Sequence, residues 1–457
     1  MFFKFVLDVP TDYRRDLAVA WFWLAVLTLL GAGIFSVLLV LARTPVVGEL
    51  IPFVDFFHTA LVIHVNLSSL VWILSFASVL WSLNSRPIFP WFAKLSFVVV
   101  LLGTLIITIS PFMGSANALM SNYIPVLDDS LFLAGLVIFG VGVGLQVVFS
   151  MSAMFKVGVT ISGQGAIRFG LNCAAIGIFV ALVAFIWSYI SLPIQLASEV
   201  YYELLFWGGG HVLQFTYTLL MMVAWLWLSS SAGLSLPISP RVALFLFGIG
   251  LLSIFITPLV YYAYDVTDVS HRQMFTMLMS FGGSLAVFPL SMAMLFALFQ
   301  KKTDSPKSSS AYTALLTSLL LFGIGGLMGF MIDGNNVKIP AHYHGCIVGV
   351  SLALMGLSYQ LLSALGFSRV NFKLSKIQLW IYASGQFLHI SGLVWSGGYG
   401  VERKVAGAAQ GLDSIERIAG MGVMGIGGLL SAIGGFMFIV IVLKAMINKS
   451  DEQTQSA

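Results

Sequence analysis

Long apolar stretches alternate with short polar ones along the whole chain of 457 residues. Each apolar stretch is long enough to cross about 30 Å of hydrocarbon, which takes roughly 20 helical residues. The stretches lie near 17–43, 52–83, 91–113, 129–156, 169–192, 200–229, 241–264, 271–299, 312–332, 340–366, 376–398 and 418–447. This pattern predicts an all-α, polytopic membrane protein of about twelve transmembrane helices.

The connecting segments are too short to hold a soluble domain, so residues 1–457 are expected to form a single transmembrane domain. Composition agrees, because only 9% of the residues are charged and 59% are hydrophobic, whereas soluble domains carry about 25% charged residues. The net charge of +4 is small and not clustered, so we expect membrane lipid and no nucleic acid as a partner. Cys173 and Cys346 lie in separate apolar stretches and predict packed thiols.

The basic residues favour one side of the membrane. Sixteen of the 22 Lys and Arg lie in the termini and the even-numbered loops, and the odd-numbered loops hold the other six. Positively charged loops stay in the cytoplasm, so we expect both termini there, in a bacterial inner membrane. No short segment with a small-residue cleavage site precedes the first apolar stretch, which is therefore expected to be retained.

Histidines mark the candidate chemistry. The seven are His58, His64, His211, His271, His342, His344 and His389, and all lie in or at the mouth of apolar stretches. Ionisable residues inside membranes are costly and commonly functional. In the predicted topology, four helices bring imidazoles to one level of the membrane. Because neutral imidazole is a common axial ligand of haem iron, this level is a candidate haem or metal site.

His342 and His344 are separated by Tyr343 alone. At about 100° of rotation per residue they project about 200° apart on a helix. They can bind two cofactors on opposite sides of the helix, although a pair of packed, hydrogen-bonded residues is the alternative.

The segment Ala341-His342-Tyr343-His344-Gly345 resembles the tenth-helix motif of subunit I in the haem–copper oxidase superfamily, which includes cytochrome c oxidase and nitric oxide reductase. The resemblance implies that His342 ligates a high-spin haem and that His344 ligates a low-spin haem. The segment beginning at His64 is similar to the second-helix motif that supplies the other low-spin ligand. His58, about 240° around the same helix, is the secondary candidate.

Two further segments are similar to motifs of this family. Trp207-Gly-Gly-Gly-His211 resembles the motif that provides the first copper or non-haem iron ligand, and its glycines would leave room for a macrocycle. His389-Ile-Ser-Gly-Leu and the later pair Arg403-Lys404 resemble the segment whose basic residues hold haem propionates. An ordinary solvated loop is the alternative for the basic pair, and a packing residue near the site is the alternative for His389.

The sequence departs from the family at the copper site. Family members carry a His-His pair at the outer end of the seventh helix, where this chain has Tyr261 and Tyr262. These tyrosines are candidate distal-site residues, and His271 lies one loop later. A copper ion needs several nitrogen or sulfur ligands, so copper is doubtful while two haems are expected.

The resemblance implies a terminal oxidase-like subunit that passes electrons from a donor through the low-spin haem to a high-spin haem that reduces dioxygen. The donor would be a cytochrome c or cupredoxin-like subunit, because the chain has no electron-entry motif of its own. One alternative is a paralogue without copper that acts in haem electron relay, gas sensing or complex assembly. Others are a nitric oxide reductase-like enzyme and a solute transporter with proton-relaying histidines.

Overall fold

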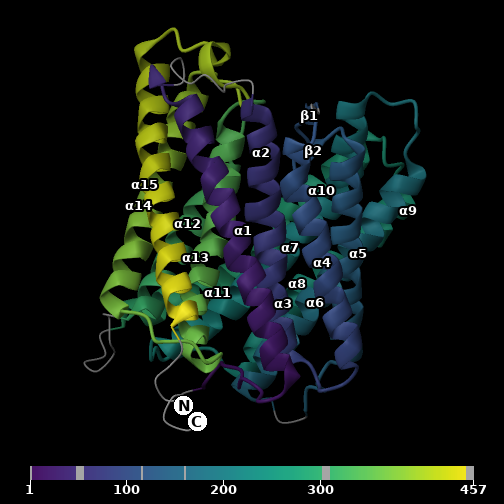
Figure 1. The fold of residues 1–457 in the computed structure, drawn as a ribbon, viewed down its shortest axis with the longest axis vertical. Coiled ribbons are helices and arrows are strands. Elements are labelled where there is room, and N and C mark those ends of the chain that lie inside the picture. The colour runs from purple at the N-terminus through teal and green to yellow at the C-terminus, as the bar shows by residue number, and fades with distance from the viewer. Residues whose placement is uncertain (1–2, 48–55, 115–116, 159–160, 301–308, 449–457) are drawn as a thin grey trace. The chain divides into compact units, whose positions relative to one another are not determined.

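The protein is almost wholly helical in the computed structural model, which describes residues 3–47, 56–114, 117–158, 161–300 and 309–448 (Figure 1). The α-helices are α1 Tyr13–Arg43, α2 Phe57–Val65, α3 Trp72–Asn84, α4 Pro90–Ile109, α5 Ser130–Ser152, α6 Gly163–Ser191, α7 Ser198–Ser231, α8 Pro240–Phe255, α9 Thr257–Ala263, α10 Val269–Met277, α11 Gly283–Phe299, α12 Ser310–Gly329, α13 Lys338–Ala364, α14 Phe372–Gly398 and α15 Ile415–Ile447. Each of the twelve apolar stretches overlaps one of these helices or a joined pair.

Short irregular elements interrupt or link the helices. The π-helical turn η3 Asn66–Val71 joins α2 to α3, and η5 Leu278–Gly282 joins α10 to α11. The 3-10 turns are η4 Ser110–Phe112 and η6 Gly407–Gln410, and the antiparallel strands β1 Ala118–Leu119 and β2 Val126–Leu127 form one hairpin. The step from α8 to α9 coincides with Pro258, whose ring and missing N–H interrupt a helix.

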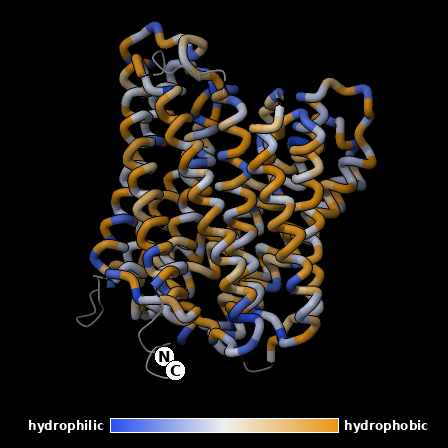
Figure 2. Tube along the Cα trace, in the orientation of Figure 1, coloured by the Kyte–Doolittle hydropathy of each residue, from blue (hydrophilic) through white to orange (hydrophobic). Residues whose placement is uncertain are grey.

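Eleven helical stretches of the described residues are long and apolar enough to cross a membrane. The remaining predicted stretch forms α14, which has 27 residues and is long enough at 1.5 Å per residue. Its polar side chains, which include Gln378 and Gln386, lower its hydropathy. Apolar residues predominate along the helices in Figure 2, as expected for a multi-pass membrane protein. Residues 52–55 and the basic segment Lys301–Lys307 lie outside the described residues.

By internal contacts the chain divides into two compact units. The first unit consists of Met1–Ala25, Leu70–Ser230 and Leu234–Lys302, and the second unit of Val26–Ser69, Ser231–Gly233 and Thr303–Ala457. Helix α1 thus contributes its first half to the first unit and its second half to the second.

Buried aromatic and polar contacts hold the first unit together. The Trp81 indole N–H of α3 donates to the Leu171 carbonyl of α6 at 3.0 Å. Ser96 of α4 donates to Gln146 of α5 at 2.7 Å, and both side chains are buried. Inside a membrane such polar groups need protein partners, and these bonds supply them.

The second unit is built from two closely packed helix pairs, α12 with α13 and α14 with α15, which run side by side in Figure 1. Gly325 and Gly345 let the backbones of α12 and α13 meet, as small residues do between membrane helices. Gln378 of α14 accepts from the Tyr359 hydroxyl of α13 at 2.9 Å and donates to the Gly434 carbonyl of α15 at 3.1 Å. These contacts fix the helices that carry most of the candidate haem ligands.

Candidate functional site

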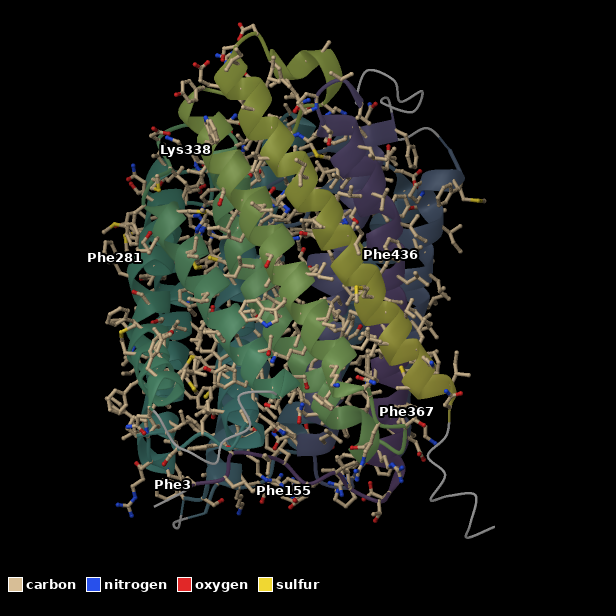
Figure 3. All side chains as sticks on the ribbon, turned by 90° about the vertical axis from the view of Figure 1, so that its left-hand side faces the viewer. Phe3, Phe155, Phe281, Lys338, Phe367 and Phe436 are labelled. Carbon is tan, nitrogen blue, oxygen red and sulfur yellow. The ribbon has the colours of Figure 1, made fainter. Side chains whose placement is uncertain are left out.

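Helix α13, whose first residue Lys338 is labelled in Figure 3, carries two candidate ligands close to that end. His342 Nδ1 lies 2.8 Å from the Gly325 carbonyl oxygen of α12. His344 Nδ1 lies 2.8 Å from the Pro340 carbonyl oxygen, one turn earlier on α13. The His344 ring faces His389 of α14, with ring centres 5.1 Å apart. The two imidazoles are therefore held against different neighbouring helices.

His64 is the second-last residue of α2, and the π-helical turn η3 begins two positions later. Its Nδ1 lies 2.9 Å from the Ala32 carbonyl oxygen of α1. The Ser68 hydroxyl donates to the His64 carbonyl at 2.6 Å and supports the turn. Such π-helical turns are rare and occur often at functional sites, so this local irregularity coincides with a candidate ligand.

The same hydrogen-bonding pattern recurs in His64, His342, His344 and His389: in each, Nδ1 lies within hydrogen-bonding distance of a backbone carbonyl oxygen. For His389 this is the Met424 carbonyl of α15, at 3.1 Å. A carbonyl only accepts, so in each ring the neutral imidazole must carry its proton on Nδ1. The Nε2 lone pair is then available, and no described residue takes it as a hydrogen-bond partner. Haem-ligating histidines need this arrangement, so these residues fit haem iron.

The spacing of the imidazole rings tests which two histidines could ligate one haem iron. His64, His344 and His389 lie near one another. Two imidazoles that ligate one iron from opposite sides, at nitrogen–metal distances of about 2 Å, have ring centres about 6 Å apart. The rings of His344 and His389 are 5.1 Å apart and tilted by 55°, which leaves no room for a macrocycle between them. His64, whose Nδ1 is likewise bonded to a carbonyl, remains the predicted partner of His344.

Basic residues gather in the loops beside this end of α13. Arg403 donates to the Asn335 side chain, and Lys404 has a left-handed backbone with φ of 64°. Arg43, at the end of α1, donates to the Glu402 carbonyl at 3.3 Å. Its Nε is buried and has no hydrogen-bond partner among the residues that the structure describes. An orphaned guanidinium N–H is suited to a carboxylate, so Arg43 joins the predicted pair as a candidate anion ligand.

His58 is placed differently from His64. It is exposed, and its Nε2 lies 3.0 Å from the Lys404 carbonyl oxygen. In the neutral ring this nitrogen therefore carries the proton, and the side chain is directed to the loop.

The first unit presents a different kind of histidine site. His211 of α7 donates from Nδ1 to the Trp207 carbonyl at 2.7 Å. Its Nε2 lies 2.9 Å from the Tyr123 hydroxyl, which must donate because Nε2 holds a lone pair. His211 is buried, and its ring centre lies 4.7 Å from that of Tyr123 and 4.9 Å from that of Trp207. Both of its nitrogens are therefore already bonded.

The glycines before His211 do not leave an open space for a macrocycle. A Cβ atom on Gly208 would overlap the Tyr261 hydroxyl, and one on Gly210 would overlap the Tyr123 ring. These glycines let aromatic side chains pack against α7.

Tyr261 and His271 form a second buried group nearby, with ring centres 4.8 Å apart. The Tyr261 hydroxyl shares a 2.8 Å hydrogen bond with Ser188. Neither ring nitrogen of His271 has a partner within the described part of the chain, although the residue is fully buried. Tyr262 is 88% exposed and points away from this group. The structure therefore brings Tyr261, but not Tyr262, towards the histidines of the first unit.

A copper centre does not fit these residues. No group of three or more His, Cys, Asp or Glu side chains in the described ranges is arranged to hold a metal ion. His211 has no free nitrogen, and its neighbours are aromatic. A stable metal site needs several ligands in a defined geometry, which this group lacks.

Comparisons with known proteins agree with the helical membrane fold. The family model described as cytochrome c and quinol oxidase polypeptide I matches residues 16–437. The chain therefore belongs to the family of haem–copper oxidase subunit I.

Similar proteins include an uncharacterized protein of Rickettsia prowazekii (strain Madrid E), 31% identical over 95% of this chain and 97% of that protein. An uncharacterized protein of Aquifex aeolicus (strain VF5) is 29% identical over 79% of this chain and 88% of its own length. The solved structure of a heme-copper terminal oxidase dimer superposes with a TM-score of 0.76 at 17% identity, over 96% of this chain and 85% of the other. That likeness shows the shared fold.

Two residues of interest were missed by sequence reasoning. Tyr123 lies in a connecting segment, and no motif links it to His211, which is 88 positions away. Arg43 ends the first apolar stretch and is one of the six basic residues of the odd-numbered loops. For Arg43 a signal existed, since a cation at a helix end beside other basic loops is a candidate for binding anions.

Proposed function

We propose that this chain is the haem-carrying subunit of a respiratory, oxidase-like electron-transfer complex. A low-spin haem would be held between His64 and His344, and a second haem by His342. The observation that carries the proposal is the shared hydrogen-bonding pattern, in which a backbone carbonyl takes Nδ1–H and leaves Nε2 free. When bound, the haems would carry electrons from a donor subunit to dioxygen, as the family name suggests.

The residues of the second unit would orient and tune these groups. Each carbonyl bond fixes the tautomer and the plane of its imidazole and makes Nε2 a better electron donor. Pro340 and Gly325 supply two of these carbonyls, so the ligand geometry depends on backbone positions that cannot easily shift. Electron transfer benefits, because a rigid ligand set changes little when the charge on the iron changes.

Arg403, Lys404 and Arg43 would neutralise haem propionates. The unpartnered buried Nε–H of Arg43 supports this role, because a buried N–H group that lacks an acceptor is costly. By the distribution of Lys and Arg, we place these loops outside and both termini in the cytoplasm of a bacterial inner membrane. The electron donor would then be an outer cytochrome c or cupredoxin-like subunit.

The test is a reduced-minus-oxidised visible spectrum of the purified full-length protein. We expect a low-spin haem signal that His344→Ala and His64→Ala each abolish. His58→Ala is the matched control, because it removes a histidine from the same helix whose Nε2 is already bonded to Lys404. A wild-type protein without haem absorbance would reject the proposal and favour a proton-relaying transporter.

A second candidate function is haem electron relay, gas sensing or complex assembly without turnover. The engagement of both nitrogens of His211 favours it, because the second metal of the family's reaction site would lack its first ligand. Sustained consumption of oxygen by the purified complex supports the oxidase. Haem reduction without sustained consumption supports the relay, and consumption of nitric oxide in place of oxygen would indicate a reductase.

A further inference from the structure

The hydrogen bonds of His211 support an inference that does not depend on haem binding in the second unit. An imidazole nitrogen has one lone pair, which points along one direction in the plane of the ring. In this structure the Tyr123 oxygen lies 2.9 Å from Nε2. A metal ion bound in that direction would sit about 2 Å from the nitrogen and would collide with the tyrosine oxygen. Metal and tyrosine hydroxyl therefore exclude one another.

Tyr123 is held in place by its own hairpin. Strands β1 and β2 pair Ala118 with Leu127 and Leu119 with Val126, and the turn between them carries Tyr123. The Asp128 N–H also donates to the Asn117 carbonyl at 2.8 Å. The tyrosine is thus presented by a closed turn rather than by a free loop.

A latch on α7 fixes the turn at a second point. The backbone N–H of Asn122 donates to Glu203 at 2.9 Å, and the Asn122 side-chain amide donates to the other oxygen of the same carboxylate. Glu203 lies two turns before His211 on one helix. Because the Glu203 carboxylate binds Asn122, the residue next to Tyr123, it fixes the position of the Tyr123 hydroxyl relative to the His211 imidazole.

Burial raises the pKa of the Tyr123 hydroxyl, and the Glu203 carboxylate adds to that shift. The hydroxyl is therefore a neutral donor at neutral pH. His211 is fully able to accept from it, because its own proton is committed to the Trp207 carbonyl.

We propose that Tyr123, positioned by the Asn122–Glu203 latch, occupies the nitrogen of His211 that would otherwise bind copper, so that a tyrosine–histidine hydrogen bond replaces the metal at this position. Tyr123 is the residue in contact with His211, and Glu203 is a positioning residue that acts through the turn. The family's copper is absent from this site because the protein supplies its own hydroxyl there.

The test is solid-state NMR of the full-length protein labelled with ¹⁵N-histidine, with the His211 signals assigned by comparison with His211→Gln. We expect a proton on Nδ1 and an unprotonated, hydrogen-bonded Nε2. Tyr123→Phe should shift the Nε2 resonance and leave the His344 resonances in place. Tyr217→Phe, which removes a buried hydroxyl from the same helix, should not shift it.

The latch is tested in the same measurement. Glu203→Gln should move the His211 Nε2 resonance part of the way towards its position in Tyr123→Phe, because one of two acceptor oxygens is lost. Glu199→Gln, one turn earlier on α7 and exposed, is the control and should have no effect.

Copper loading supplies the second readout. Wild-type protein exposed to Cu(I) under competition from a chelator should retain no stoichiometric copper. Copper at one ion per chain that His211→Gln removes would overturn the inference, as would an Nε2 resonance unchanged by Tyr123→Phe. A protein that binds no haem but shows the tyrosine-dependent resonance would reject the proposed function and support this inference.

Discussion

His211 of the first unit and the half-buried histidines of the second unit are hydrogen-bonded in opposite ways. In the second unit, His64, His342 and His344 each give Nδ1–H to a backbone carbonyl and keep Nε2 free. In the first unit, His211 begins with the same carbonyl bond, but Tyr123 takes its Nε2. The comparison teaches that a histidine in a family motif is a ligand only if its second nitrogen is left unbonded. Motif matching alone cannot distinguish the two cases.

The largest expected effect is the difference in haem content between removing a proposed ligand of the second unit and removing His211 of the first unit. His342→Ala should lose one haem per chain, because its Nε2 is the proposed ligand. His211→Ala should keep the full haem content, because neither of its nitrogens is free. Haem per chain, measured as the pyridine haemochrome, checks both variants. Equal loss in the two would remove the distinction between the units.

A smaller effect is expected from crowding one ligand without removing it. A Cβ atom at Gly329 would lie 2.8 Å from His342 Nδ1, so Gly329→Ala should displace the imidazole and lower occupancy of the second haem. Overpacking of this kind destabilises by about 1–3 kcal/mol. Gly326→Ala is the matched control on the same helix, because nothing lies within 4 Å of its Cβ position. Haem content and thermal unfolding in detergent measure the effect, and identical behaviour of the two variants would count against the placement of His342.

His271 offers a test of the first unit by itself. Both of its ring nitrogens are buried and unpartnered within the described residues, and a buried unsatisfied polar group costs about 1–3 kcal/mol. His271→Leu should therefore stabilise the protein by about 1 kcal/mol or more, seen as a higher midpoint of thermal unfolding. Destabilisation would mean that His271 has a bound partner and belongs with the ligands.

The smallest effect concerns the loop beside α13. Hydrogen bonds from Lys338 and then Asn336 hold the pKa of Asp333 below its ordinary value. Because the folded pKa is lowered, the stabilisation is present above the unfolded value and is lost as the pH falls through the folded one. Asp333→Asn should thus lower the unfolding midpoint slightly at pH 7 and match wild type in strong acid. A difference that grows on acidification would contradict this sign.

Sequence reasoning could predict the helices because the period and length of apolar stretches decide them in a bilayer. It also predicted correctly that His342 and His344 project to different sides of their helix, since helix geometry fixes the angle between them. In the structure the two rings contact different helices. It could not foresee that Tyr123 reaches His211, because a hairpin sets that contact across 88 positions. Nor could it tell that the glycines next to His211 accommodate aromatic rings.

The sequence also could not show how close His389 lies to His344. Their ring spacing depends on the packing of α14 against α13 and α15. With 5.1 Å between the His344 and His389 rings, only a structure shows that this pair is too close for a haem.

The metal content of purified wild-type protein, with iron and copper counted per chain by mass spectrometry, tests the central claim most directly. The account predicts two haem irons and no stoichiometric copper, because the second unit offers free imidazole nitrogens and His211 of the first unit does not. Stoichiometric copper beside the iron, or the absence of iron, would contradict it.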